Sequence, residues 1–411
     1  MSNKDNMLAE RLIAADDARH RGESDWHLSS LEGLSPENHA KLTQLIDTVQ
    51  LVDELAKLDL PREASQSEDE TQTATFPPVG RENGLPDHFG DYRIRSLIAR
   101  GGFGAVFLAE DQRTRRKVAI KVPRPDVLIT DDLRYRFLTE ARAAGTLCHP
   151  NIVTVREAIS EPTPAIVYEY CEGGTLADVL RAGTELSEQQ VLGFAICLAE
   201  ALKHAHDRGV LHRDLKPSNI LLTETSEKGP QKQFQIGQTL WTPKLTDFGL
   251  ARLMDDCDRH TRTGTVLGTT EYMAPEQVAG QTSQTGTHTD IFAFGILLYQ
   301  LLTGKLPFQG PTRLQTLLRI ESAEPDRPRL IRPQLSVEIE LICLKCLQKV
   351  PEARYESAAA LLHDLKALRD SKPISIVPPS FRNQFGYWYR QNRRLVNGLV
   401  FLNVFLIVVV L

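Results

Sequence analysis

Cysteine is scarce in this chain and shows no pairing pattern. Six cysteines are scattered over 411 residues, which argues against a disulfide scaffold and favours free thiols in a reducing, cytosolic compartment. Cys343 and Cys346 form a CxxC, but no second cysteine pair or histidine cluster accompanies them. We therefore interpret them as a buried pair on one helix, with a redox or metal site as the alternative.

Net charge is also small. With 48 lysines and arginines against 53 aspartates and glutamates, the formal net charge is −5, so the charge balance gives no reason to expect nucleic-acid binding. The N-terminus lacks the charged and then apolar pattern of a secretory signal. A chain of this length has room for one large domain of two lobes together with additional segments.

Two segments before residue 89 differ from the rest in composition. Residues 1–60 carry an apolar stripe at helical spacing, which predicts a helical N-terminal extension. The stripe could pack on the rest of the chain, on a second copy or on a partner, and the sequence does not choose among them. Residues 61–88 include the acidic run 65–71 and few apolar residues, so we predict a disordered linker. The stripe comprises Leu42, Leu45, Ile46, Val49, Val52 and Leu55.

The stretch 212–219, His-Arg-Asp-Leu-Lys-Pro-Ser-Asn, places three groups suited to phosphoryl transfer close together. Asp214 can accept the proton of an attacking hydroxyl, Lys216 can neutralise charge on the transferred group, and Asn219 can hold a magnesium ion. Asp247, in the Asp-Phe-Gly sequence 247–249, supplies a further carboxylate for a hard cation.

This stretch resembles the catalytic loop of eukaryotic-type (Hanks-type) protein kinases, and Lys216 after Leu215 is typical of the Ser/Thr branch. The whole pattern is similar to that of bacterial membrane-anchored members. The resemblance implies an α+β, bilobal protein kinase fold over residues 89–370. A small β-rich N-lobe (89–168) would lie over a larger helical C-lobe (173–370), with ATP and Mg²⁺ in the cleft between them.

Residues 99–106, Ala-Arg-Gly-Gly-Phe-Gly-Ala-Val, resemble the glycine-rich loop of this family. Glycines here let the backbone approach a phosphate without a Cβ clash, and Val106 is expected to pack against adenine. Kinases usually have glycine where this chain has Ala99, whose methyl group is expected to weaken ATP binding without preventing it. Alone, such a turn is more typical of a β-hairpin. The nucleotide contacts predicted in this loop are Ala99, Arg100, Gly101, Gly102, Phe103, Gly104 and Val106.

Residues 118–121, Val-Ala-Ile-Lys, form a short β-rich run that ends in a lysine. A lysine within an apolar strand needs an ionic partner, and Glu140 lies on the inner side of a helix predicted to begin near Asp131. We predict a Lys121–Glu140 ion pair that positions the α- and β-phosphates; the alternative is a surface pair of Glu140 with Arg136. The inner stripe of this helix is Leu133, Phe137, Ala141, Ala144 and Leu147.

Residues 165–171 resemble the strand and hinge that join the two lobes of a kinase. The resemblance implies that the backbone at Glu169 and Cys171 binds adenine. It also implies that Ala119 lines the same site and that Tyr168 limits its depth.

Residues 247–276 resemble the activation segment, which ends with Ala-Pro-Glu at 274–276. The resemblance implies that Thr269 lies against Asp214 and Lys216. Arg213 directly precedes Asp214, an arrangement often found in kinases that phosphorylation of this segment switches on, because the guanidinium needs an anion. A threonine-rich loop without a switch is the alternative. The predicted phosphorylation sites are Thr261, Thr263 and Thr265.

Two later features are predicted to be structural, and one insertion is predicted to lie at the surface. Residues 290–295 resemble the helix that braces the catalytic loop, with Phe292 where tryptophan is common, and Arg354 is expected to pair with Glu276. The insertion 223–243 is interpreted as a surface loop, with a partner site as the alternative.

The C-terminal part changes composition again. Residues 371–394 are basic and aromatic, and residues 395–411 contain no charged side chain. Seventeen helical residues span about 25 Å, near the lower limit for a bilayer core of roughly 30 Å. We predict a single membrane span, cut short or acting as a tail anchor, with the kinase on the cytoplasmic face. A short core helix is the alternative.

Together these motifs predict an ATP-dependent Ser/Thr protein kinase that acts on protein hydroxyls and phosphorylates its own activation segment, in homodimers or between neighbours. A pseudokinase that serves as a scaffold or binding module is the alternative, and Ala99 is its only support. A small-molecule phosphotransferase is disfavoured by the peptide-binding elements Gly268-Thr269 and Ala274-Pro275-Glu276.

Overall fold

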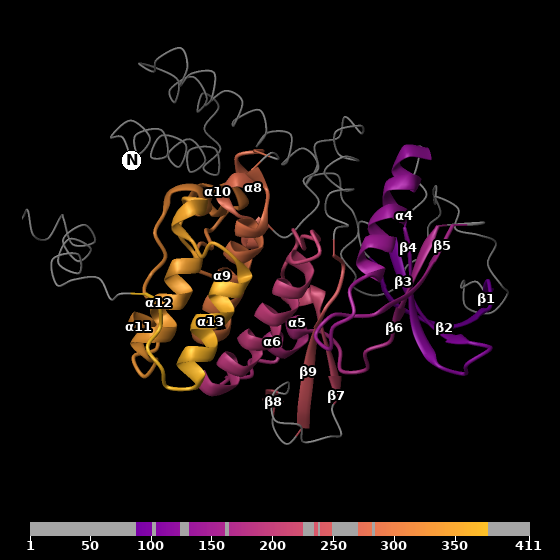
Figure 1. Cartoon of the computed structure of the whole chain (residues 1–411), viewed down its shortest axis with the longest axis horizontal. Coiled ribbons are helices and arrows are strands. Elements are labelled where there is room, and N and C mark those ends of the chain that lie inside the picture. The colour runs from indigo at the N-terminus through magenta and orange to yellow at the C-terminus, as the bar shows by residue number, and fades with distance from the viewer. Residues whose placement is uncertain are drawn as a thin grey trace, which may run out of the picture.

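The computed structural model describes residues 88–100, 104–123, 131–160, 164–224, 234–236, 239–248, 270–281 and 284–376. These residues form two lobes, a β-rich one and a helical one, which lie side by side in Figure 1. The predicted two-lobed α+β architecture is therefore confirmed for this part of the chain.

The N-lobe is built on one antiparallel sheet with the strand order β1-β2-β3-β4-β6-β5. In β3 every second residue is buried, as expected for a strand with one face on a core. The strands are β1 (His88–Phe89), β2 (Tyr92–Arg100), β3 (Gly104–Asp111), β4 (Lys117–Pro123), β5 (Val155–Ile159) and β6 (Ala165–Glu169).

Helix α4 (Asp131–Gly145) packs beside β5 in this lobe. The apolar stripe predicted for it is confirmed for its four residues within the helix, and Leu147, which follows the end of the helix, is also buried. Phe137 and Ala141 are fully enclosed and share a cluster with Ile166 and Tyr168 of β6. This packing fixes the face of α4 that lies against the sheet.

The C-lobe is helical, and its core surrounds α6 and α9. Ser187 caps α6 with a capping box, in which its Oγ accepts from the N–H of Gln190 and its own N–H donates to Gln190 Oε1. Helix α9 ends at Gly304, whose φ of 71° suits a residue without a Cβ. The helices are α5 (Leu176–Arg181), α6 (Glu188–His206), α8 (Pro275–Val278), α9 (Thr287–Thr303), α10 (Arg313–Ser322), α11 (Pro328–Ile331), α12 (Val337–Cys346) and α13 (Ala358–Arg369), with 3₁₀ turns η1 (Pro217–Asn219), η2 (Thr270–Tyr272) and η4 (Pro351–Ala353).

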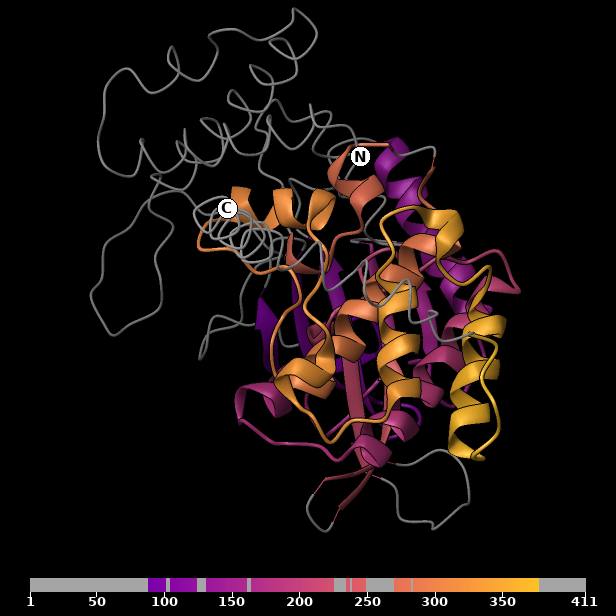
Figure 2. The same cartoon turned by 90° about the vertical axis from the view of Figure 1, so that its left-hand side faces the viewer.

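Helix α13 packs along α6, and α12 packs against both α9 and α13, so the last helices of the lobe close its outer side (Figure 2). Cys343 and Cys346 lie on α12 and are fully buried, and burial raises the pKa of both thiols. The prediction of a buried helical pair is confirmed.

The insertion 223–243 differs from our expectation of a surface loop. Three antiparallel strands in the order β7-β9-β8 occupy much of it: β7 (Ile220–Glu224), β8 (Phe234–Ile236) and β9 (Thr239–Leu245). Aromatic and β-branched residues such as Trp241 favour strands, and Trp241 packs on the C-lobe core. The loop interpretation is therefore wrong for residues 223–224, 234–236 and 239–243, and residues 225–233 and 237–238 lie outside the described part.

The two lobes are joined by contacts that converge on β9. The N–H of Val153 donates to the carbonyl of Leu245 at 2.8 Å, and the N–H of Leu245 donates to the carbonyl of Asn151 at 2.9 Å. Glu169, at the end of β6, accepts from Lys244 Nζ at 2.7 Å. These bonds fix where the hinge leaves the N-lobe and so set the position of the cleft.

The predictions for residues 1–60, 61–87 and 377–411 lie outside the described residues, and with them the helical extension, the linker, most of the basic juxtamembrane segment and the membrane span 395–411. Between residues 88 and 376, no helix in the described ranges is long and apolar enough to cross a bilayer. The domain boundaries remain predictions.

Candidate active site

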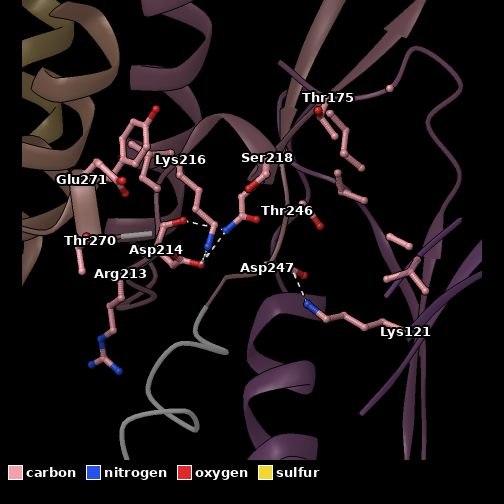
Figure 3. A pocket seen from close by; sticks show the side chains of 18 of the residues that line it. Lys121, Thr175, Arg213, Asp214, Lys216, Ser218, Thr246, Asp247, Thr270 and Glu271 are labelled. Atoms are coloured by element: carbon pink, nitrogen blue, oxygen red, sulfur yellow. Dashed lines mark hydrogen bonds and ion pairs between the residues drawn. The ribbon is translucent and has the colours of Figure 1, made fainter. Parts of the chain in front are cut away.

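One cavity of about 1130 Å³ lies between the lobes and is lined by the predicted catalytic residues Lys121, Asp214 and Lys216. Its walls come from β2, β3 and β4 on one side and from the catalytic loop, β7 and η2 on the other. Figure 3 shows Lys121 entering from the strands and Asp214 and Lys216 from the opposite wall, with Asp247 between them.

The side chains of the catalytic loop converge on Asp214. Lys216 Nζ lies 2.8 Å from Asp214 Oδ2. Asn219 donates from Nδ2 to Asp214 Oδ2 at 3.0 Å and to the Asp214 carbonyl at 2.8 Å. Because Asp214 takes both amide contacts of Asn219, Asn219 Oδ1 is the atom left to ligate a cation. The carboxylate, the ammonium group and the amide therefore act as one preorganised group.

Asp290 of α9 holds this loop from beneath. Its carboxylate accepts the backbone N–H of His212 at 2.9 Å and of Arg213 at 2.7 Å, and His206 Nε2 lies 2.8 Å from Oδ2. Burial alone would raise the pKa of Asp290, but the contacts with His206 and His212 outweigh it and hold that pKa below its usual value. The predicted bracing role of segment 290–295 is confirmed.

The backbone is strained at both catalytic motifs. Arg213 has φ of 67° and Asp247 has φ of 64°, a region that residues with a Cβ rarely adopt. Such conformations persist only where the surroundings enforce them. Here Asp290 holds the N–H of Arg213, and Gln277 Nε2 donates to its carbonyl at 3.1 Å.

Lys121 of β4 lies on the opposite wall, and its Nζ is 2.7 Å from Asp247 Oδ2. Both side chains are largely buried, with 13% and 24% of the side-chain surface exposed. Glu140 lies half-buried on α4 of the same lobe. The structure thus shows an ion pair between Lys121 and Asp247, and the Lys121–Glu140 pair remains a prediction.

The nucleotide end of the cavity contains every predicted contact that falls in the described ranges. Gly104 has a packing role beyond the predicted one, because a Cβ there would lie 2.1 Å from the carbonyl oxygen of Val122. Gly101, Gly102, Phe103 and Thr269 lie outside the described residues. The lining residues are Ala99, Arg100, Gly104, Val106, Ala119, Tyr168, Glu169 and Cys171.

The oxygen ligands suit magnesium bound together with a nucleotide. Asp247 and Asn219 both line the cavity, and no group of three or more His, Cys, Asp or Glu side chains among the described residues could hold a metal alone. Mg²⁺ is usually held by one or two carboxylates with phosphate oxygens completing its shell. The residues present therefore fit Mg²⁺ that arrives with ATP.

The site also includes residues that sequence reasoning missed. The loop Gln309–Thr312 and Arg313 of α10 line the cavity far from the catalytic loop in sequence. Gln277 ties the end of the activation segment to the catalytic loop, because it contacts the carbonyl of Arg213 and accepts from the N–H of Ala274. No motif marks the loop Gln309–Thr312, and only the tertiary structure brings it to the site.

Comparisons with known proteins agree with this geometry. Residues 92–365 match the protein kinase domain family. The chain is 35% identical over 291 residues to a probable serine/threonine-protein kinase of Streptomyces coelicolor, covering 69% of this chain and 41% of that protein. It is 33% identical over 294 residues to the serine/threonine-protein kinase PknB of Mycobacterium leprae, covering 70% and 44%.

The chain therefore belongs to the protein kinase family, on its bacterial Hanks-type Ser/Thr branch. It spans less than half the length of these relatives. The crystal structure of Rad53 residues 1–466 in complex with AMP-PNP is similar in fold, with a TM-score of 0.53, 28% identity and coverage of 67% of this chain and 64% of that one. The pseudokinase alternative gains no support from these relatives.

Proposed function

We propose that this protein is an ATP-dependent Ser/Thr protein kinase that transfers the γ-phosphate of ATP to serine or threonine hydroxyls of proteins. Lys121 positions the α- and β-phosphates, Asp247 and Asn219 hold Mg²⁺, Asp214 orients the substrate hydroxyl, and Lys216 stabilises the transferred charge. Glu140 supports Lys121 in this scheme, and Thr269 lies against Asp214 and Lys216.

One observation carries the proposal. A single cavity places the Lys121–Asp247 pair opposite the Asp214 cluster. A nucleotide between the two walls would present its terminal phosphate to both. The AMP-PNP complex of Rad53 supports the nucleotide assignment, and ATP with Mg²⁺ is the cofactor pair that this family uses.

The test is incubation of the full 411-residue chain with labelled ATP and Mg²⁺. Asp214→Ala and Lys121→Ala are expected to abolish transfer to serine and threonine. Lys117→Ala is the matched control, because Lys117 lies on the same strand but is exposed, and it is expected to retain the parental rate. If Asp214→Ala transferred phosphate as fast as the parent, the catalytic role assigned to Asp214 would be refuted.

Activation by phosphate at Thr261, Thr263 or Thr265 is proposed as the regulatory layer. The Nε atom of Arg213 is buried and makes no hydrogen bond within the described structure. Figure 3 shows its guanidinium turned away from Asp214. A phosphothreonine would supply the missing anion. Mass spectrometry should find phosphate on this segment after incubation with ATP, and Arg213→Ala should lose the accompanying rise in rate.

We further propose that residues 395–411 tether the kinase to a membrane with its catalytic part in the cytoplasm, where neighbours phosphorylate one another. The support is the uncharged apolar run and its basic, aromatic N-terminal flank. Flotation of the full chain with vesicles tests this, and Val404→Lys with Leu406→Lys is expected to release it. Equal flotation of parent and variant would refute the tether.

A further inference from the structure

The cavity does not end at the catalytic loop. Beyond Asp214 it passes η2 and reaches the loop Gln309–Thr312 and the first turn of α10, where Arg313 and Thr316 line it. A second cavity of about 550 Å³ adjoins it, and the two share Gln309, Gly310 and Pro311 as a common wall. An extended peptide with its hydroxyl at Asp214 could therefore continue over this wall.

The charges along this extension are mainly positive. Arg313 lines the first cavity, and Lys305 and Arg319 line the second. Among the described residues that line this end of the cavity, Glu271 is the one with a carboxylate. Its negative charge interacts favourably with the guanidinium of Arg313. All three cations are exposed at the surface of this extension. We name Lys305, Arg313 and Arg319 the basic rim.

The basic rim belongs to a fixed surface. Arg319 donates from Nη1 to the carbonyl of Gln309, which holds the shared wall against α10. The N–H of Gly310 donates to Thr316 Oγ1 at 3.0 Å. A Cβ on Gly310 would lie 2.7 Å from Gln315 Cβ, so the loop sits directly on the helix. The shared wall and the first turns of α10, which carry Arg313 and Arg319, are therefore held together by packing and hydrogen bonds.

The sequence contains a segment whose chemistry matches this rim. Residues 65–71 read Ser-Gln-Ser-Glu-Asp-Glu-Thr, with three consecutive acidic residues directly before Thr71. His88 follows 17 positions later, and an extended chain of that length spans up to roughly 60 Å. A segment tethered at His88 can therefore search a radius of up to roughly 60 Å around that residue, on its own kinase or on a neighbour.

We propose that the basic rim binds an acidic stretch beside the phosphorylated residue, and that the acidic segment 65–71 of this chain is such a substrate, with Thr71 as the acceptor. This inference rests on the proposed kinase activity and adds its substrate class. Complementary charge at a solvent-exposed rim mainly guides binding and is screened by salt, so the preference lies in KM and weakens at high ionic strength.

The experiment compares two peptides covering residues 65–75, one natural and one with Glu68→Gln, Asp69→Asn and Glu70→Gln. The enzymes are the full-length parent, the double variant Lys305→Glu/Arg313→Glu, and Arg329→Glu as control. Arg329 is exposed on α11 and lines neither cavity. With exposed pairs each contributing modestly, we expect the parent to favour the acidic peptide by about tenfold in kcat/KM.

The double variant is expected to lose or reverse this preference, and the Arg329→Glu control is expected to keep both the preference and the parental kcat for the neutral peptide. In the full chain, phosphate should appear on Thr71. Equal kcat/KM for both peptides with the parent would overturn the inference and leave the kinase activity standing. Absence of any transfer, to peptides or to the chain itself, would overturn both.

Discussion

Removing Arg354 is the sharpest test of the C-lobe architecture. Its guanidinium pairs with Glu276 through two 2.8 Å contacts, and both side chains are almost fully buried, with 0% and 2% exposed. It also donates to the carbonyls of His288, Gln348 and Lys349. Arg354→Met keeps the apolar stem but leaves a buried carboxylate without its partner, which costs about 3–5 kcal/mol.

The pH dependence makes this prediction specific. Burial alone would raise the pKa of Glu276, but the hydrogen bonds and charge of Arg354 outweigh it and hold that pKa below its usual value. The parent therefore keeps this stabilisation above the unfolded pKa of about 4.3 and loses it as pH falls further. In Arg354→Met only the hydrogen bonds from Thr289 and from the Glu276 backbone oppose burial, so the Glu276 pKa rises above that of the parent. The variant then loses stability as pH rises through the raised pKa.

The free energies of unfolding of the parent and of Arg354→Met are therefore expected to approach each other as pH falls. Urea unfolding followed by circular dichroism should give a smaller difference in unfolding free energy between parent and Arg354→Met at pH 5 than at pH 7. Arg329→Met, at an exposed site, should stay within about 0.5 kcal/mol of the parent. A cost below about 1 kcal/mol, or one that does not change with pH, would refute the reasoning.

Three further outcomes are expected. Gly173→Ala would place a Cβ 2.2 Å from Trp241 Cζ3 and 2.6 Å from the Leu222 carbonyl oxygen, so it should lower the free energy of unfolding by about 1–3 kcal/mol. Gly193→Ala in α6 is the matched control, because nothing lies within 4 Å of its added Cβ, and it should raise the free energy of unfolding by up to about 1 kcal/mol. Thermal unfolding measures both changes. Asp290→Ala removes the acceptor of two catalytic-loop N–H groups; steady-state kinetics should give a kcat lower by about a hundredfold and an ATP KM within about twofold of the parent, and an unchanged kcat would contradict the bracing role. Cys148 is exposed, whereas Cys343 and Cys346 are buried and have raised thiol pKa values. Alkylation of the native chain, followed by peptide mapping, should therefore label Cys148 well before the other two. Equal labelling of all three would count against the burial of Cys343 and Cys346.

Much of the fold and the site could be predicted because short motifs carry their own chemistry. The stripe of α4 followed from helical spacing alone, and Phe137 and Ala141 are enclosed as expected. Lys121, Asp214 and Asp247 meet in one cavity because their motifs belong to elements whose order and type the resemblance supplied. The pairing of Arg354 with Glu276, 78 positions apart in sequence, was predicted in the same way.

Other features depended on contacts that spacing does not encode. Strand β8 has three residues, too few to show a period, and it exists through its register with β9. Gly104 is required by the carbonyl of Val122 on the neighbouring strand, which the loop motif alone does not indicate. The loop Gln309–Thr312 reaches the cavity through packing of α10, so it carries no local signal.

At Arg213 and Asp247, which have left-handed backbone conformations, selection for stability and selection for catalysis favour different residues. Glycine or asparagine would adopt these dihedral angles with less strain, so a library of variants screened only for thermal resistance should gain such residues at both positions. Either replacement would remove a guanidinium or a carboxylate that the proposed chemistry requires. The protein therefore carries a permanent thermodynamic cost at its catalytic centre, and ancestral or consensus designs of this lobe would have to retain it to stay active.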